Sequence, residues 1–190
     1  MKVIVEVSGH HCHLSGSDLA VLFGKNYQLK FLKPVSQPGQ FVAKEKVDVK
    51  ISRFFLRNVS IIGPARGSSI VEISPTENYL LKGNALTVGY GKEAKKNTGG
   101  LVEIIGPKGK VKSKALIIPQ RHIHVDPKTA QKLKLKTGQK VSVKVSGKEA
   151  VTFHNVLVRV DKNFKTRVHL NTDEGNAAGI VGQTLGELII

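Results

Sequence analysis

Hydrophobic and polar positions alternate along this chain in short runs, which is typical of β-strands that bury one face. The first run, Val3 to Val7, predicts that the chain enters a sheet almost at its first residue. Further strands are predicted at 27–32, 69–73, 101–105, 141–145, 151–160 and 166–170, with two more inside 47–62. The segment 33–40 contains two prolines and a glycine, which predicts a stretch without regular structure.

The predicted helices are short and begin directly after strands. One spans 17–23 and is closed by Gly24, one follows Ser74-Pro75 and ends near Gly83, and one follows Asp126-Pro127. The chain also repeats itself: His11-Cys12-His13 recurs as His122-Ile123-His124. Such duplication predicts a mainly β protein of two small, similar β-barrels with short capping helices.

Four segments share one pattern, in which a potential metal ligand is followed by an aliphatic residue and a helix-capping residue. They are His13-Leu14-Ser15, Glu72-Ile73-Ser74, His124-Val125-Asp126 and His169-Leu170-Asn171. Residues two apart on a strand project from the same face, so His11 joins His13 and His122 joins His124. Six candidate ligands therefore lie at strand ends that lead into helix starts.

A single His-x-His pair is a weak signal for a metal, but five of the seven histidines are among these six candidate ligands. Glu72 lies between apolar neighbours, where burying its carboxylate is costly unless a metal, an arginine partner or solvent exposure compensates. Cys12 alternates with its histidine neighbours, which favours core packing over a ligand role. His154 lies among Thr152, Val156 and Val158, and we interpret it as a structural histidine on an apolar face.

The 190 residues are 40% hydrophobic, which is enough for one large domain or two small ones. There is no apolar run long enough to span a membrane and no secretory signal, so we expect an intracellular protein. The net charge of +16 favours an anionic partner such as nucleic acid, a nucleotide or a polyphosphate cofactor, or else a solvated lysine-rich surface. Few aromatic residues argue against a binder of single-stranded nucleic acid. Residues 89–100 are predicted as a basic loop.

The order and spacing of several motifs resemble one family over almost the whole chain. The motifs are His11-Cys12-His13-Leu14-Ser15, 32–41 (LKPVSQPGQF), Gly63-Pro64-Ala65-Arg66, Val71-Glu72-Ile73-Ser74, Arg121-His122-Ile123-His124 and 169–174 (HLNTDE). They are similar to the PduL-type phosphotransacylases, or phosphate propanoyltransferases. The resemblance implies an enzyme that moves an acyl group between coenzyme A and phosphate, built as two β-barrels, usually dimeric, with two metal ions, most often zinc. We place one domain at 1–10 plus 119–190 and the other at 11–118.

The resemblance also implies roles for individual residues. It places one metal on His11, His13 and Glu72, where the sulfur of coenzyme A also binds, and a second, partly water-ligated metal on His122, His124 and His169. Arg66 matches a phosphate-binding arginine. The chain departs from the family pattern at His10, where an arginine is common, and at Cys12, which replaces a typical valine. His10 is therefore either a surface residue or a donor that supports the ligands.

Four further residues are weaker candidates for substrate binding. Gln37 and Gln40 flank a Pro-Gly turn, and Lys33 and Arg121 carry charges that suit the phosphates of coenzyme A, although loop structure or a solvated surface also explains them. Asp173 and Glu174 suit a helix start, where negative charge is favoured.

The chemistry expected of such residues is direct attack of phosphate on a thioester, because phosphate is already an anion and needs no strong base. Two alternatives remain: a zinc-dependent thioester hydrolase and a non-enzymatic basic barrel that binds RNA. The resemblance implies a role in acetate or propanediol metabolism, and it implies an extra amphipathic N-terminal segment in members that are associated with bacterial microcompartments. Here the first strand begins at once, so we expect a cytoplasmic form, with a microcompartment form as the alternative. The residues do not identify the acyl group.

Overall fold

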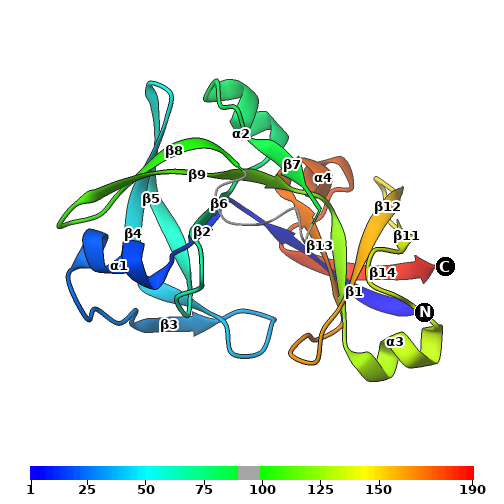
Figure 1. Ribbon diagram of the computed structural model, residues 1–190. Helices are drawn as coiled ribbons and strands as arrows, with labels where there is room; N and C mark the ends of the chain where they lie inside the picture. Colours follow the sequence, from blue (N-terminus) through cyan, green and yellow to red (C-terminus); the bar gives the residue numbers. More distant parts are fainter. Residues whose placement is uncertain (90–98) are drawn as a thin grey trace. The chain divides into compact units, whose positions relative to one another are not determined.

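The computed structural model describes residues 1–89 and 99–190, so most of the predicted basic loop at 89–100 lies outside the described residues (Figure 1). The chain forms two compact units. Met1–Gly9 and Pro119–Ile190 make up the first, and His10–Ile118 make up the second. The prediction of a mainly β protein with two barrels and short helices is confirmed.

The first unit is a closed barrel whose strands come from both ends of the chain. Its strands in order around the barrel are β1 (Lys2–Ser8), β13 (Arg167–Asn171), β10 (His122–Val125), β12 (Val151–Val160), β11 (Lys140–Val145) and β14 (Gln183–Ile189). In Figure 1 the blue β1 accordingly lies in the same barrel as the orange and red strands β13 and β14. Two short helices, α3 (Pro127–Leu133) and α4 (Thr172–Ala177), follow β10 and β13.

The second unit closes in the same way through pairwise hydrogen bonding. Its strands in order are β9 (Lys110–Pro119), β6 (Ile70–Glu72), β2 (His11–His13), β5 (Phe54–Gly63), β4 (Phe41–Ile51) and β8 (Gly100–Ile105), which pairs with β9 again. Among the described residues of this unit, two strands lie outside this ring: β3 (Phe31–Pro34) pairs with β4, and β7 (Leu86–Val88) pairs with β9. Helices α1 (Gly16–Phe23) and α2 (Pro75–Leu80) follow β2 and β6.

The two barrels repeat each other strand for strand. In both, a His-x-His strand runs parallel to one long strand and antiparallel to the strand with the third candidate ligand. The first strand of each half of the chain is exchanged: β1 joins the barrel formed by the second half, and β9 joins the barrel formed by the first half. Each barrel has its own core of aliphatic side chains, in which valines dominate the first unit.

Three local predictions are wrong. Residues 27–30 are not a strand, because Glu45 accepts hydrogen bonds from the Tyr27 hydroxyl and the Lys30 backbone and so holds this segment as an irregular packing loop. The strand that follows continues to Pro34, inside the stretch expected to lack regular structure. His154 is exposed, with Nδ1 2.8 Å from the Ser142 hydroxyl, rather than placed on an apolar face.

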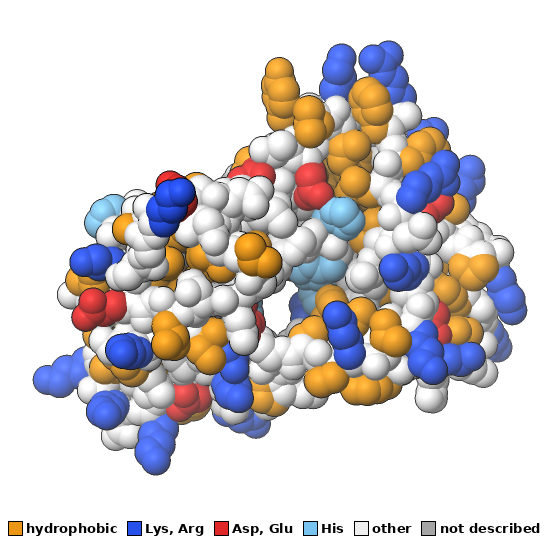
Figure 2. Space-filling view, turned by 180° about the vertical axis from the view of Figure 1, so that it is seen from behind, with side chains coloured by type: hydrophobic (Ala, Val, Ile, Leu, Met, Phe, Trp, Pro, Cys, Tyr) orange, Lys and Arg blue, Asp and Glu red, His pale blue; other side chains and the backbone are white. Residues whose placement is uncertain are grey.

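The lysines and arginines responsible for the charge lie at separate places on the face seen in Figure 2. Among the described residues, none of the helices has both the length and the apolar character needed to cross a lipid bilayer.

Candidate metal centres

Each candidate ligand strand is fixed at its end by the two residues that follow the ligand. The aliphatic residue is almost fully buried in all four cases: Leu14, Ile73, Val125 and Leu170 are at most 2% exposed. The next residue caps a helix, since Ser15 and Asp126 accept from the backbone three residues on, and Ser74 and Asn171 form complete capping boxes. Each cap contributes about 1 kcal/mol, so sequence and packing together hold the ligand positions firmly.

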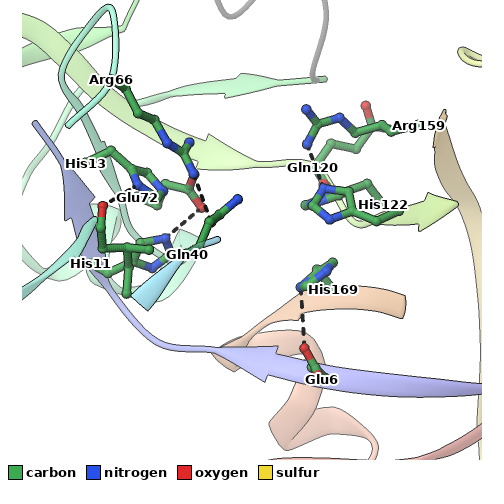
Figure 3. Close-up of polar contacts among 12 residues, drawn as sticks. Glu6, His11, His13, Gln40, Arg66, Glu72, Gln120, His122, Arg159 and His169 are labelled. Atoms are coloured by element: carbon green, nitrogen blue, oxygen red, sulfur yellow. Dashed lines mark hydrogen bonds and ion pairs between the residues drawn. The ribbon is translucent and has the colours of Figure 1, made fainter. Parts of the chain in front are cut away.

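The first candidate group contains His11, His13 and Glu72. His11 on β2 lies directly opposite Glu72 on β6 in antiparallel register. The ligand atoms of the three residues lie within 4.8 Å of one another, and His11 Nε2 is 3.5 Å from Glu72 Oε2 (Figure 3). His13 and Glu72 are buried, so these closely spaced ligand atoms have little contact with solvent.

His13 is held as a neutral imidazole with its Nε2 lone pair available. Its Nδ1 donates to the backbone oxygen of Ile62 at 3.0 Å, and a carbonyl can only accept, so the proton sits on Nδ1. Burial lowers the pKa of His13 well below its usual value, and the positive charge of Arg66 and the neighbouring His11 lower it further. This combination of tautomer and low proton affinity suits a metal ligand.

Arg66 lies beside this group and is anchored at both ends. Its backbone N–H donates to the oxygen of Leu14 at 2.8 Å, which ties it to the residue after His13. Its Nη2 donates to Gln40 Oε1 at 3.1 Å, so Gln40 aims the guanidinium (Figure 3). Gln37 is buried, and its backbone oxygen accepts from the Gln40 N–H in the turn that carries both residues.

The second candidate group contains His122, His124 and His169. His122 on β10 lies opposite His169 on β13, the same register that joins His11 to Glu72. The ring centroids are 4.6 to 5.1 Å apart, and the ligand atoms again lie within 4.8 Å of one another. His122 Nδ1 donates to the Gln120 oxygen at 2.9 Å, and burial, His169 and Arg159 lower its pKa well below the usual value. His122 is therefore also a neutral imidazole that carries its lone pair on Nε2.

The donor sets fit divalent cations, and they fit zinc in particular. Two imidazoles with a carboxylate and three imidazoles are both sets that zinc accepts, and each leaves a position for an exogenous ligand. Two of the histidines donate their other ring nitrogen to a backbone carbonyl, as metal-binding histidines usually do.

Two charged residues near the second group were not predicted. Arg159 lies opposite His124 on the neighbouring strand, and its Nη1 donates to His124 Nε2 at 2.9 Å. A neutral imidazole has one lone pair, so a cation bound at this nitrogen has to displace Arg159. Glu6 on β1 lies 4.0 Å from His169 Nδ1 and 3.1 Å from Arg167 Nη1. Both could have been found in the sequence as charged residues within otherwise apolar strands. Glu6 lies within Val3 to Val7, and Arg159 lies within Val156 to Val160.

The weaker candidates lie in different environments. Lys33 is exposed on β3. Arg121 donates from Nε to Glu174 Oε1 at 2.9 Å. Burial raises the pKa of Glu174, and its hydrogen bonds with the Asn171 backbone and with Arg121 oppose this rise. His10 Nδ1 lies 2.5 Å from Glu77 Oε1, a contact that raises the pKa of His10.

Cys12 packs in the core on the face opposite the two histidines, as expected from the alternation along β2. It is fully buried, and burial raises the pKa of its thiol to about 12. Its thiolate is therefore scarce at neutral pH, which removes it from the candidate ligands and nucleophiles.

We expect Cys12 to resist alkylation in the folded protein. Native protein treated with iodoacetamide at pH 8 should remain unmodified, as judged by intact-mass measurement, whereas protein unfolded in guanidinium should gain one adduct. Rapid labelling of the native protein at a rate typical of a free thiol would show that the residue is accessible.

Comparisons with known proteins place the chain in a family. The phosphate propanoyltransferase family profile matches residues 4–181. A phosphate propanoyltransferase of Enterococcus faecalis is 40% identical over 185 residues, which cover 97% of this chain and 87% of that protein. One of Thermotoga maritima is 42% identical over 178 residues, covering 93% and 83%, and one of Clostridioides difficile is 38% identical over 191 residues, covering 97% and 88%. The chain therefore belongs to the phosphate propanoyltransferase family and is an acyltransferase.

Proposed function

We propose that this protein transfers a short acyl group between coenzyme A and inorganic phosphate, giving acyl phosphate and free coenzyme A in a reversible reaction. The observation that carries the proposal is the pair of three-ligand groups, one of them beside an anchored arginine, in a chain of this family.

In this proposal His11, His13 and Glu72 hold one divalent ion, and His122, His124 and His169 hold another. Bound zinc would stabilise a thiolate leaving group and polarise oxygen atoms of the substrates. Short helices and buried aliphatic residues fix these side chains before any cation arrives, which reduces the entropy lost on binding.

Arg66 is proposed to bind the phosphate. Its planar guanidinium can donate two parallel hydrogen bonds to two phosphate oxygens, and Gln40 already orients it through Nη2. Phosphate at neutral pH is an anion with free lone pairs, so the chain needs to orient it rather than deprotonate it. Attack by a phosphate oxygen on the thioester carbonyl forms the new C–O bond, and the C–S bond then breaks with the electron pair leaving on sulfur.

No covalent acyl-enzyme is needed in this scheme. Cys12, the single cysteine of the chain, is buried with its thiol protonated. Acylated protein that accumulates after mixing with acyl-CoA alone would contradict direct attack.

The experiment that tests the proposal measures both products. Purified protein is incubated with acetyl-, propanoyl- or butanoyl-CoA, with and without phosphate, and free thiol and acyl phosphate are quantified separately. We expect thiol release only when phosphate is present, with equimolar acyl phosphate, and its loss after treatment with a chelator. Equal thiol release without phosphate would instead establish a thioester hydrolase.

Metal analysis completes this test. Elemental analysis of the protein should give about two equivalents per chain, one for each group, and activity lost to a chelator should return on adding zinc. A metal-free protein without transfer activity would favour the non-enzymatic basic barrel. We also propose a homodimer, which light scattering on the purified protein tests directly.

A further inference from the structure

The two residues that immediately precede the His-x-His segments make the same contact. His10 Nδ1 donates to Glu77 Oε1 at 2.5 Å, and Arg121 Nε donates to Glu174 Oε1 at 2.9 Å. In each barrel the acceptor is the glutamate of the capping box that starts the helix after the third candidate ligand. The contact therefore follows the internal duplication of the chain, although histidine stands in one barrel and arginine in the other.

Each glutamate makes a second contact with its other oxygen. Glu77 Oε2 accepts the Ser74 backbone N–H at 2.8 Å, and Glu174 Oε2 accepts the Asn171 backbone N–H at 3.0 Å. Ser74 and Asn171 lie two residues after Glu72 and His169. One carboxylate thus joins the backbone just after the third ligand to the side chain just before the first ligand.

The strands that this carboxylate joins are short. In the second unit, β2 and β6 have three residues each, so the register between His11 and Glu72 depends on a small number of backbone hydrogen bonds. In the first unit the equivalent register pairs His122 with His169. A link at the end of such a strand pair restricts sliding and splaying of the strands, and so restricts the distance between opposing ligands.

We propose that His10 and Arg121 are positioning residues that tie each His-x-His strand to the strand of the third ligand through Glu77 and Glu174. This inference rests on the proposed metal-binding role of the two groups and adds how their geometry is held. His10 and Arg121 act through metal affinity and take no part in the chemistry.

The competing explanation is an ordinary surface pair. The side chains of His10 and Arg121 are 37% and 35% exposed, and exposed ion pairs contribute little to stability. Two features separate these contacts from that class. The acceptor is held by a second hydrogen bond to the backbone, and two different donor side chains make the same link at matching positions of both barrels.

The test measures each metal group alone in the full-length chain. Replacing His122 and His124 with alanine leaves the first group, and replacing His11 and His13 with alanine leaves the second. Zinc affinity of the metal-free proteins is measured by competition with a chromogenic chelator, and circular dichroism checks the fold. H10A and R121A are then introduced into both backgrounds, so each substitution serves as the matched control for the other.

We expect H10A to weaken zinc binding about 10-fold at the first group and to leave the second group unchanged. R121A should weaken zinc binding by a similar factor at the second group and leave the first unchanged. Residues that support metal ligands contribute to metal affinity on this scale. H10R should restore binding at the first group, since arginine makes the same link in the other barrel. E77Q keeps an oxygen for the Ser74 N–H and should weaken zinc binding less than H10A combined with E77A.

Unchanged affinity in H10A and R121A would overturn the inference, as would equal weakening at both groups, which indicates general destabilisation. Failure of H10R to bind zinc better than H10A would also overturn it. A parent protein that binds no zinc would refute the proposed function together with this inference. If the parent binds zinc and neither H10A nor R121A changes its zinc affinity, only this inference is refuted and the proposed function stands.

Discussion

Replacing His13 with alanine is expected to lower kcat/KM for acyl transfer by about 1,000-fold, which corresponds to about 4 kcal/mol of lost transition-state stabilisation. His13 is 4% exposed and its Nδ1 is committed to the Ile62 oxygen, so Nε2 is the ligand atom that it offers, and alanine removes one of the three ligand atoms of the group. Bound metal should fall from two equivalents per chain to one, because His11 and Glu72 alone make a weak site.

The measurement combines steady-state kinetics with elemental analysis of the same preparation. Cys12→Ala is the matched control, since Cys12 is the next residue on β2 but faces the core. It should reduce the midpoint of thermal unfolding and leave metal content and kcat/KM close to those of the parent. A His13→Ala protein that keeps both metal equivalents and near-normal turnover would remove the first group from the proposed mechanism.

The local features of the ligand segments were predictable because their causes are local. Helix caps and the burial of the aliphatic residue depend on the few residues around each helix start. All four segments have a cap and a buried aliphatic residue, and the segments at Ser74 and Asn171 also have a capping box. The opposite orientation of Cys12 followed from strand alternation alone. That His11 lies opposite Glu72 depends on pairing between distant strands, and it could be proposed only from the resemblance to a family.

Two barrel strands were missed because their alternation is carried by charged or small residues. In β9 the exposed positions of the first half are lysines and the positions between them are Val111 and Ser113, so the alternation is weak before the apolar run at its end. In β14 a glycine stands at a position that faces the core, where an added Cβ would lie 2.8 Å from a Val5 methyl group. The exchange of β1 and β9 between the barrels leaves no trace in local pattern.

The error at His154 has a single backbone cause. The prediction assumed strict alternation from Thr152 to Val158, but Asn155 adopts a positive φ of 57°, and the register with β11 shifts at this point. Phe153 and Val156 consequently both face the core, and His154 faces outward. An irregularity of this kind reverses which side chains are buried, and strand periodicity alone cannot locate it.

Replacing Arg66 with alanine is expected to raise KM for phosphate about 100-fold while changing KM for acyl-CoA much less. Two charge-assisted hydrogen bonds to one anion contribute about 3 kcal/mol together, and that energy corresponds to a factor of about 100. Arg66→Lys should recover only part of the loss, because an ammonium cannot present two parallel donors. Gln40→Ala should give a smaller rise in KM for phosphate, since it frees Nη2 without removing the charge.

Initial rates measured over a grid of phosphate and acyl-CoA concentrations separate these effects. Arg57→Ala provides the control, because Arg57 belongs to the same barrel but is exposed and paired with Asp48 on the neighbouring strand. It should leave both KM values unchanged, which shows that loss of one positive charge from this barrel is not enough to weaken phosphate binding. If Arg66→Ala raised both KM values equally, the guanidinium would be supporting the metal group as a whole, and the phosphate would need another binding residue.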